Sequence, residues 1–229
     1  MGSNIPVSIS QLGLNLAENP GDVAVALQIL LLLTVLTLAP AILILMTSFT
    51  RVVISLSFVR NALATNQMPP TQVIIGLSLF LTFFIMAPVF TEAYNNGIAP
   101  YLAEEIDFET ALTNTLNPIR EFMFKHTREK DLEIFLEMRG ASQPVSKDDV
   151  DTLTLIPAFV ISELKTAFQI GFMIYIPFLV IDMIVSSVLM AMGMMMLPPV
   201  MISLPFKILL FVLVDGWNLV VKSLLISFR

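Results

Sequence analysis

Long apolar tracts constrain the fold of this 229-residue chain more than any other feature. Four of them stand out, at residues 23–46, 73–91, 153–197 and 200–228. A helix needs roughly 20 apolar residues to cross the hydrocarbon core of a membrane, and the first, second and fourth tracts have about that length. The third is about twice too long at roughly 1.5 Å per residue. We therefore expect it to bend, break or fold back, with Gly171, Pro177 and Asp182 marking where.

Composition places the chain among membrane proteins. Apolar residues make up 56% of it and charged residues only 13%, and the mean hydropathy of +0.86 is far above that of a soluble domain. The apolar tracts and their joints contain seven prolines, at positions 40, 88, 157, 177, 198, 199 and 205. Such a density indicates irregular helices whose freed carbonyls need other partners. The predicted fold class is all-α, built from hydrophobic helical hairpins with kinked or broken helices.

Charge is concentrated in residues 92–151, which hold 13 of the 18 acidic and 6 of the 12 basic residues. Between the first two tracts, Arg51 and Arg60 are the only charges. The positive-inside rule then puts residues 47–72 in the cytoplasm and 92–151 outside, which predicts four spans and an external insertion. No cluster of lysine and arginine resembles a phosphate-tracking patch, so we expect no nucleic-acid partner. The absence of cysteine excludes disulfides and thiolate chemistry.

The charged insertion is predicted to be helical. Asp107 is a suitable N-cap for a first helix, because its side chain can accept from a free backbone N–H. Asn117 followed by Pro118 is typical of the start of a second helix, since proline is favoured at the first helical position. Gly140 would end that second helix.

Charged residues inside the two C-terminal tracts need partners. These residues are Glu163, Lys165, Asp182, Lys207 and Asp215. Lys207 has no acidic residue three or four positions away, so its partner must come from another helix or another subunit. Since an unpaired buried charge costs several kcal/mol, we take Glu163 as the first choice of partner. Two alternatives remain open: Lys207 extends to a membrane interface, or Asp182 is a buried acid of a proton relay.

A methionine-rich stretch lies where the third tract meets the fourth. It contains Met190, Met192, Met194, Met195 and Met196 and is followed by two prolines. Methionine is apolar, unbranched and polarizable, so the stretch suits an adaptable core or an apolar pore constriction. Thioethers also bind Cu(I), but no histidine or cysteine lies nearby, and we expect neither a metal nor a cofactor. Gly193, Pro198 and Pro199 would end the flanking helices and act as hinges of a loop.

Enzyme motifs are absent from the sequence. It contains no HExxH, no phosphate-binding glycine loop and a single histidine, His126, which stands beside Lys125 and is expected on a solvated helix face. A small-solute channel or transporter is the alternative function, because it too needs broken helices and buried charges. Such proteins usually have repeated halves, which are not visible here.

Three stretches together resemble the FliP family of flagellar biosynthesis proteins, which includes the equivalent subunit of virulence type III secretion systems. They are "MTSFTRVVISLSFVRNAL" and the residues that follow it to position 90, "PAFVISELKTAFQIGF" at 157–172, and "IPFLVIDMIVSSVLMAMGMMMLPPVMISLPFKILLFVLVDGW" at 176–217. The likeness extends over nearly the whole chain after about residue 23. One departure is Ala64-Thr65, where the family often has a glycine.

The resemblance implies roles for particular residues. Met194, Met195 and Met196 match a methionine gasket that projects into a pore and seals it. Glu163 and Lys207 match charged positions that pair between neighbouring subunits.

The resemblance also implies the setting of the protein. It would be a core subunit of the flagellar protein export gate, in the bacterial inner membrane and basal body, with much of the assembled gate on the periplasmic side. Its partners would be other copies of itself in a pentamer, the Q and R subunits of the gate, the export components FlhA and FlhB, and the unfolded flagellar proteins that pass through.

The expected organisation has four parts. Residues 1–22 would be the N-terminal segment left after signal-peptide removal, and 23–91 a first apolar helical hairpin. Residues 92–151 would be the charged helical segment in the periplasm, and 152–229 broken helices with the pore loop. Apolar tracts buried against other subunits would reduce the number of true membrane spans below four.

Overall fold

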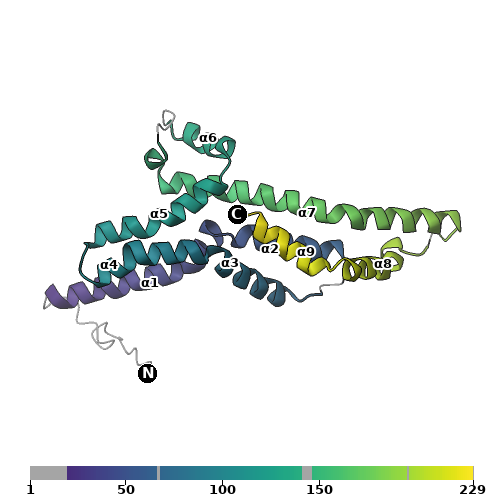
Figure 1. Cartoon of the computed structure of the whole chain (residues 1–229), viewed down its shortest axis with the longest axis horizontal. Coiled ribbons are helices and arrows are strands. Elements are labelled where there is room, and N and C mark those ends of the chain that lie inside the picture. Colours follow the sequence, from purple (N-terminus) through teal and green to yellow (C-terminus); the bar gives the residue numbers. More distant parts are fainter. Residues whose placement is uncertain (1–19, 66–67, 141–145, 195, 229) are drawn as a thin grey trace, which may run out of the picture. The chain divides into compact units, whose positions relative to one another are not determined.

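The chain is helical throughout the part that the structure, a computed structural model, describes: residues 20–65, 68–140, 146–194 and 196–228. The α-helices are α1 (Pro20–Met46), α2 (Phe49–Ala62), α3 (Thr71–Ala93), α4 (Ala99–Leu102), α5 (Phe108–His126), α6 (Glu129–Met138), α7 (Thr152–Ala191), α8 (Pro199–Leu213) and α9 (Gly216–Ile226). A π-helical turn, Tyr94–Ile98, joins α3 to α4, and a short 3₁₀ turn, Lys147–Asp149, precedes α7 (Figure 1). No strand occurs in these ranges, and the all-α prediction is confirmed.

The chain divides into two compact units, Met1–Ile42 and Leu43–Arg229. The described part of the first unit is the length of α1 up to Ile42, an apolar helix with exposed leucines. Its threonine hydroxyls donate to carbonyls one turn back, Thr34 to Leu30 at 2.8 Å and Thr37 to Thr34 at 2.9 Å. These two hydroxyls are therefore satisfied within the helix. The sites described below lie in the second unit.

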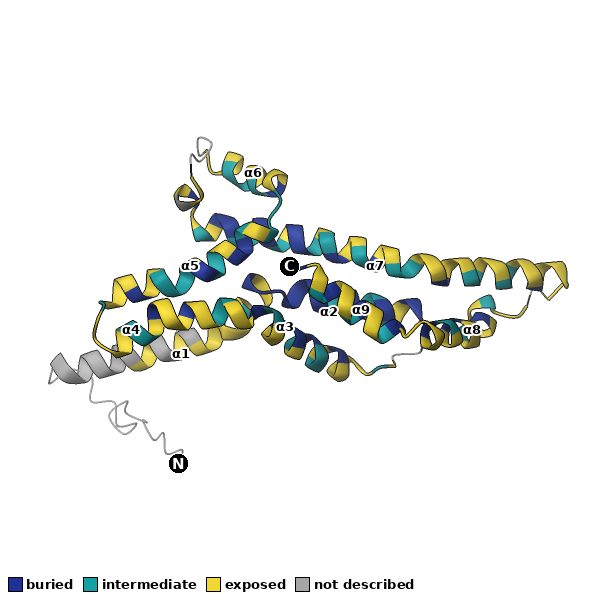
Figure 2. Ribbon diagram, viewed as in Figure 1, coloured by how far each residue is buried: buried dark blue, intermediate teal, exposed yellow. Residues whose placement is uncertain are grey.

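Helix α2 is the centre of the second unit, where it packs mainly on α7 and α3. Val52, Leu56 and Val59 are completely buried at the spacing of one helix face, and the opposite side of α2 is partly exposed (Figure 2). The core continues through Phe159 of α7 and Leu224 of α9, which are also fully buried. This core fixes the first half of α7, whereas the second half of α7 and much of α8 are exposed (Figure 2).

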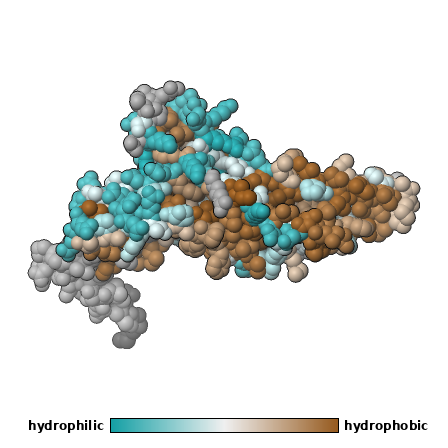
Figure 3. Space-filling view, viewed as in Figure 1, coloured by the Kyte–Doolittle hydropathy of each residue, from teal (hydrophilic) through white to brown (hydrophobic). Residues whose placement is uncertain are grey.

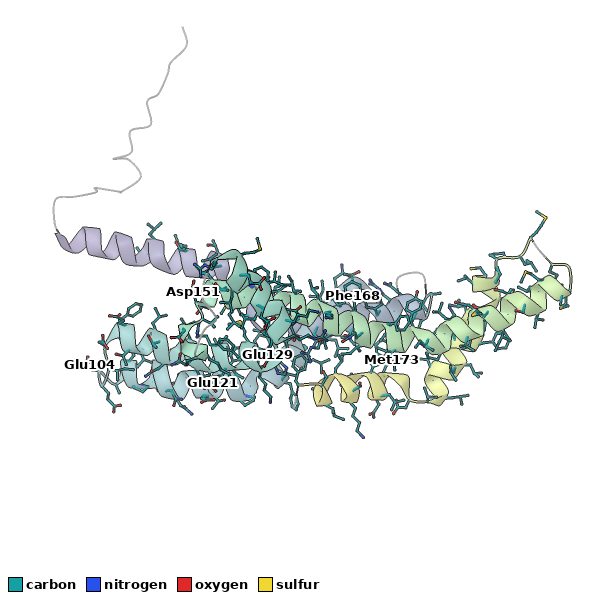
Figure 4. All side chains as sticks on the ribbon, turned by 90° about the horizontal axis from the view of Figure 1, so that it is seen from above. Glu104, Glu121, Glu129, Asp151, Phe168 and Met173 are labelled. Atoms are coloured by element: carbon teal, nitrogen blue, oxygen red, sulfur yellow. The ribbon has the colours of Figure 1, made fainter. Side chains whose placement is uncertain are left out.

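Helix α7 is one continuous helix of 40 residues, so the third apolar tract does not break or fold back at Gly171, Pro177 or Asp182, and its break comes after Ala191. Pro157 and Pro177 both lie inside the helix. A proline removes one backbone hydrogen bond, but packing against α2, α5, α6 and α8 supports the rest of the ladder. Gly171 marks a close approach between α7 and α2, since a Cβ there would lie 2.4 Å from the ring of Phe58. That ring also makes an edge contact with Phe168, which Figure 4 labels on α7.

Helices α5 and α6 make up most of the charged insertion, but they divide at a different point from the one expected. Asp107 caps α5 as predicted and accepts the N–H of Thr110 at 3.4 Å. The expected helix start at Asn117-Pro118 is wrong, because α5 runs through a buried Pro118 to His126. The break falls at Arg128, whose backbone N–H donates to the hydroxyl of Ser162 on α7 at 3.0 Å. A tertiary hydrogen bond thus replaces the helical one at this position.

Two helical stretches of the described chain are long and apolar enough to cross a membrane, Thr71–Leu102 and Thr152–Ala191. The number rises to four if each bent helix pair counts as one span, and α8 with α9, bent by 62°, forms one such pair. These lengths and compositions support the membrane character of the protein. The four-part organisation and the four-span topology stay predictions, and residues 1–19 of the N-terminal segment lie outside the described ranges.

Replacing Ala64 by glycine should stabilise the protein. Ala64 follows α2 with a positive φ of 54° while its N–H donates to the carbonyl of Asn61 at 3.1 Å. The left-handed conformation costs a residue with a Cβ about 1 kcal/mol, so Ala64→Gly should raise the free energy of unfolding by about 0.5–1 kcal/mol. Denaturant unfolding of the purified protein measures this change. The matched control is Ala62→Gly at the buried last residue of α2, which should lower stability by about 1 kcal/mol. A loss of stability in Ala64→Gly would contradict the prediction.

Candidate functional site

The methionine-rich joint between α7 and α8 is a short loop with a defined geometry. Gly193 has a φ of +74°, its N–H donates to the carbonyl of Met190 at 3.0 Å, and the N–H of Met194 donates to that of Leu189 at 3.0 Å. This pair of bonds is a Schellman motif, which satisfies the last carbonyls of α7. Pro198 and Pro199 begin α8, with Pro199 at a position where a missing N–H removes no helical bond. The helices therefore end where the sequence indicated, and the role of these three residues as hinges stays a prediction.

The described methionines of the loop point away from the core of the chain. Met196 is 98% exposed and Met194 is 41% exposed, while Met190 and Met192 are more than half exposed. Met195 lies outside the described residues. Since these side chains do not fill a core within one chain, the core-packing interpretation does not hold for the protomer. Their apolar surface is available to lipid or to other subunits.

An apolar groove of about 620 Å³ lies beside the loop. It is lined by α7 residues such as Val188, by Met192 and Met194 of the loop, and by Phe206 of α8. Figure 3 shows that this half of α7 and α8 is covered by hydrophobic side chains, whereas hydrophilic side chains gather over α5 and α6. The loop therefore stands on the apolar part of the unit.

Lys207 and Asp182 form an ion pair between α8 and α7. The ammonium Nζ of Lys207 donates to Asp182 Oδ2 at 2.7 Å, and the hydroxyl of Ser203 donates to Oδ1 at 2.5 Å. The Lys207 side chain is 2% exposed and that of Asp182 is 24% exposed. The prediction that Lys207 needs a partner on another helix is confirmed in this protomer. Lys207 does not extend to an interface, and Asp182 is a bonded counter-ion.

Glu163 is paired with Arg51, which joins α7 to α2. Arg51 Nε donates to Glu163 Oε2 at 2.9 Å, and its Nη2 donates to Oε1. Its Nη1 donates to the carbonyl and the hydroxyl of Ser227, at 3.0 and 3.1 Å, and the guanidinium lies 3.8 Å from the centre of the Phe228 ring. Both charged side chains are buried, at 4% and 0% exposure. In a buried pair with this many hydrogen bonds, the attraction between the charges offsets the cost of taking them out of water. Removal of one member would leave the other charge buried without a partner, which is strongly destabilising.

Within one chain, therefore, Glu163 and Lys207 bind other residues and do not bind each other. Sequence analysis missed Arg51, because it was counted as a loop charge that fixes topology. Arg51, Ser55, Val59 and Ala62 are all buried and lie at helical spacing on α2, and this pattern is the signal that places the arginine in the core. The proposed contact between Glu163 and Lys207 of neighbouring subunits stays a prediction.

His126 is packed at the end of α5 and is not on a solvated face. Its ring lies 4.8 Å from that of Phe122 and 5.2 Å from that of Phe228, measured between ring centres. Burial, and then the positive charges of Arg51 and Lys125, lower the pKa of His126 to about 4. The imidazole is therefore neutral at ordinary pH and cannot add a second positive charge beside Arg51.

Three arginines fasten α5 and α6 to α7 and to the residues just before it. Arg120 donates to the carbonyl of Val150 at 2.7 Å, Arg128 to Gln169 at 2.7 Å, and Arg139 to Asp151 at 2.8 Å. These bonds end on neutral oxygens or on an exposed carboxylate. The charged insertion is therefore docked on the start of α7, with most of its acidic side chains free of salt bridges among the described residues.

Long apolar helices, buried ion pairs and a charged helical insertion together define a helical membrane protein. The chain matches the model of the FliP family over residues 32–224. It is 63% identical over 212 residues to the flagellar biosynthetic protein FliP of Bacillus subtilis, an alignment that covers 93% of this chain and 96% of the relative. It is 54% identical to the FliP of Pectobacterium carotovorum over 89% of this chain and 79% of that one, and 50% identical to the FliP of Treponema pallidum over 90% and 77%. The chain belongs to the FliP family, a family of flagellar biosynthesis proteins and not of enzymes.

The two ion pairs should appear as couplings in double-mutant cycles. Asp182→Ala and Lys207→Ala should each destabilise the protein, and the double variant should lose less than the sum, with a coupling on the order of 1–3 kcal/mol. The same result is expected for Arg51→Ala with Glu163→Ala. Unfolding of the purified full chain measures each value.

Lys165, exposed on α7 and without a salt bridge among the described residues, provides the matched control. Lys165→Ala combined with Asp182→Ala should be additive. Additivity in the Asp182–Lys207 cycle itself would mean that this pair contributes nothing to stability.

Proposed function

We propose that this chain is a core subunit of the flagellar type III protein export gate, in which several copies surround a pore for unfolded flagellar proteins. The observation that carries the proposal is the loop at the joint of α7 and α8, where Met194 and the almost fully exposed Met196 stand at the end of two apolar helices. Membership of a family of flagellar biosynthesis proteins supports the flagellar setting.

The exposed apolar surface of α7 and α8 supports an assembled state. Large apolar side chains such as Phe172, Met183 and Val212 are more than half exposed in the protomer, and surfaces of this kind need lipid or other subunits as neighbours. We propose that further copies, in a pentamer, and the Q and R subunits cover part of this surface. FlhA and FlhB would be further partners, and the assembly would stand in the inner membrane and basal body, partly on its periplasmic side.

A methionine collar suits the task of such a pore. A protein export channel has to hold back ions and water between substrates and then admit chains of many sequences. Narrow apolar constrictions exclude water, and methionine adapts its shape through three rotatable bonds and packs on varied surfaces. The ring of subunits would multiply Met194, Met195 and Met196 into a gasket. The anchored ends of the loop at Gly193 and Pro198 would keep the collar in place while its side chains move.

Deletion of Met194 to Met196 should make the assembled gate leaky to ions while protein secretion partly survives, because the seal is lost and the channel is kept. Ion conductance of cells or of reconstituted complexes measures the leak. Leucine at all three positions should retain most of the seal, since it preserves apolar volume. Met138→Ser, at an exposed methionine on α6, is the matched control and should leave conductance unchanged. Unchanged conductance after the deletion would contradict the gasket.

We also propose that assembly brings Glu163 of one subunit to Lys207 of the next. One of the three N–H groups of Lys207 donates to Asp182, so the ammonium has donors left for a second carboxylate. Exchange of the two residues, Glu163→Lys with Lys207→Glu, should then retain assembly better than either single change. The size of the extracted complex measures assembly. The proposal is contradicted if all three variants lose assembly equally while exchange of Arg51 with Glu163 restores it. Only the ion pairs within the protomer would then remain.

A further inference from the structure

A cavity of about 630 Å³ between α3, α5 and the C-terminal end of the chain has no role in the proposed export function. Its apolar wall includes Ile85, Pro88 and Val89 of α3, and Phe228. Its polar wall comes from α5 and from the turn before α7. The cavity therefore lies at the end of the apolar stretch of a candidate membrane span, where the sequence changes to charged residues at Glu92.

Three cations line the polar wall: Arg120, Lys125 and Lys147. Arg120 and Lys147 lie above the same ring, Phe124, at 5.6 and 5.9 Å from its centre. Arg120 donates to the hydroxyl of Thr152 and to two backbone carbonyls, all of them neutral oxygens that leave its charge uncompensated. Among the described residues, none of the three cations is in a salt bridge.

Two carboxylates, Glu92 and Glu121, line the same cavity, and Figure 4 labels Glu121 on α5. Neither forms a salt bridge with a described residue. A simple anion in this cavity is attracted by the three positive groups but repelled by the two carboxylates. A ligand that carries a negative and a positive group can pair with both sets of side chains. A phosphate joined to a primary ammonium has this pattern, and its N–H groups can donate to carboxylates.

His126 supplies an independent sign of a missing ligand. His126 lines the cavity, and its buried Nε2 has no hydrogen-bond partner among the described residues. Buried polar atoms are nearly always satisfied, so an orphan beside a cavity indicates a polar group that enters it. Phe122 and Phe228 pack on the ring itself and offer no acceptor or donor.

An apolar stripe on α3 leads into the cavity. Phe80 and Phe84 are 77% and 70% exposed, and with Pro88 and Glu92 they follow one another at steps of four residues, which places them along one side of the helix. A lipid chain lying on this stripe would bring its headgroup to Glu92 and the cations. Cavities with basic residues next to membrane helices are common sites of lipid headgroups.

We propose that this cavity binds the headgroup of a phospholipid of the phosphatidylethanolamine type. The phosphate lies against Arg120, Lys125 and Lys147, the ammonium lies against Glu92 and Glu121, and the acyl chains follow the α3 stripe. The site does not rest on the proposed export function, because it concerns a lipid bound by the single chain.

Native mass spectrometry of the purified full-length protein in a non-ionic detergent tests the site. Phosphatidylethanolamine, phosphatidylglycerol and phosphatidylcholine with identical acyl chains, and phosphoethanolamine and inorganic phosphate without chains, are titrated separately. We expect phosphatidylethanolamine to bind about tenfold more tightly than phosphatidylcholine, whose quaternary ammonium has no N–H to donate. Equal binding of the three lipids would overturn the headgroup assignment, and tight binding of free phosphate would replace the lipid by a soluble anion.

Variants separate the two halves of the headgroup. Lys125→Gln with Lys147→Gln should weaken the binding of phosphatidylethanolamine about tenfold, and Glu92→Gln should abolish the preference for phosphatidylethanolamine over phosphatidylcholine. Lys130→Gln on α6, an exposed lysine outside the cavity, is the matched control and should change neither value. Thermal unfolding of each variant shows whether it is folded as the wild type is. Equal weakening by Lys130→Gln would reduce the effect to surface charge and contradict the proposal.

Discussion

One buried guanidinium holds three distant parts of this chain together. Arg51 on α2 binds Glu163 on α7 through two of its nitrogens and Ser227 at the chain end through a third, and its flat face lies on Phe228. These contacts take the place of water around the guanidinium. The buried charge is therefore stable only while α2, α7 and the C-terminal residues are all in place. The position of α7 over α2, and of the C-terminal end beside α5, both depend on this arrangement.

The second ion pair, between Lys207 and Asp182, joins the C-terminal half of α7 to α8. Beyond the core around α2, α7 continues without support from α5 or α6, and Lys207 with Asp182 and Ser203 ties it to α8. Because the ammonium is 2% exposed, the pair presents little charge to the surroundings. The two helices can thus form a long apolar projection that ends in the methionine loop. An uncompensated charge at either place would require water in a surface that otherwise excludes it.

The sequence was sufficient for those features that follow from local chemistry. Asp107 caps α5, Gly193 ends α7 in a left-handed turn, and Pro199 begins α8, because each residue type suits its backbone position wherever the rest of the chain lies. The charged residues on apolar helices likewise demanded partners, and Lys207 has one on another helix.

Other features depended on tertiary contacts and were not visible in the sequence. Helix α7 stays continuous through Pro177 because it packs on other helices. Gly171 gives room for the ring of Phe58, and the hydroxyl of Ser162 on α7 binds the backbone where α5 ends. The partners of Glu163 and Lys207 within the protomer could not be identified from the sequence for the same reason. Several acidic residues satisfy the charge rule for Lys207, and only the register of α7 against α8 decides among them. Ala64 is an intermediate case, since its unusual place in the family pattern coincides with its positive φ.

The placement of charge has a consequence for any assembly of these subunits. Both buried pairs are compensated inside the protomer, so the projecting halves of α7 and α8 offer neighbours an almost purely apolar surface. Between apolar helices in a membrane, association depends on close packing and gains little from the hydrophobic effect, since lipid tails are equally apolar. Apart from the proposed contact between Glu163 and Lys207, directional contacts must come from elsewhere. Residues 92–151 carry most of the acidic side chains of the chain, and most of those that the structure describes are exposed. In the proposed assembly, the hydrophilic segment is therefore well suited to orient neighbouring copies, while the methionines of the apolar projection keep the adaptable shape that the proposed collar needs.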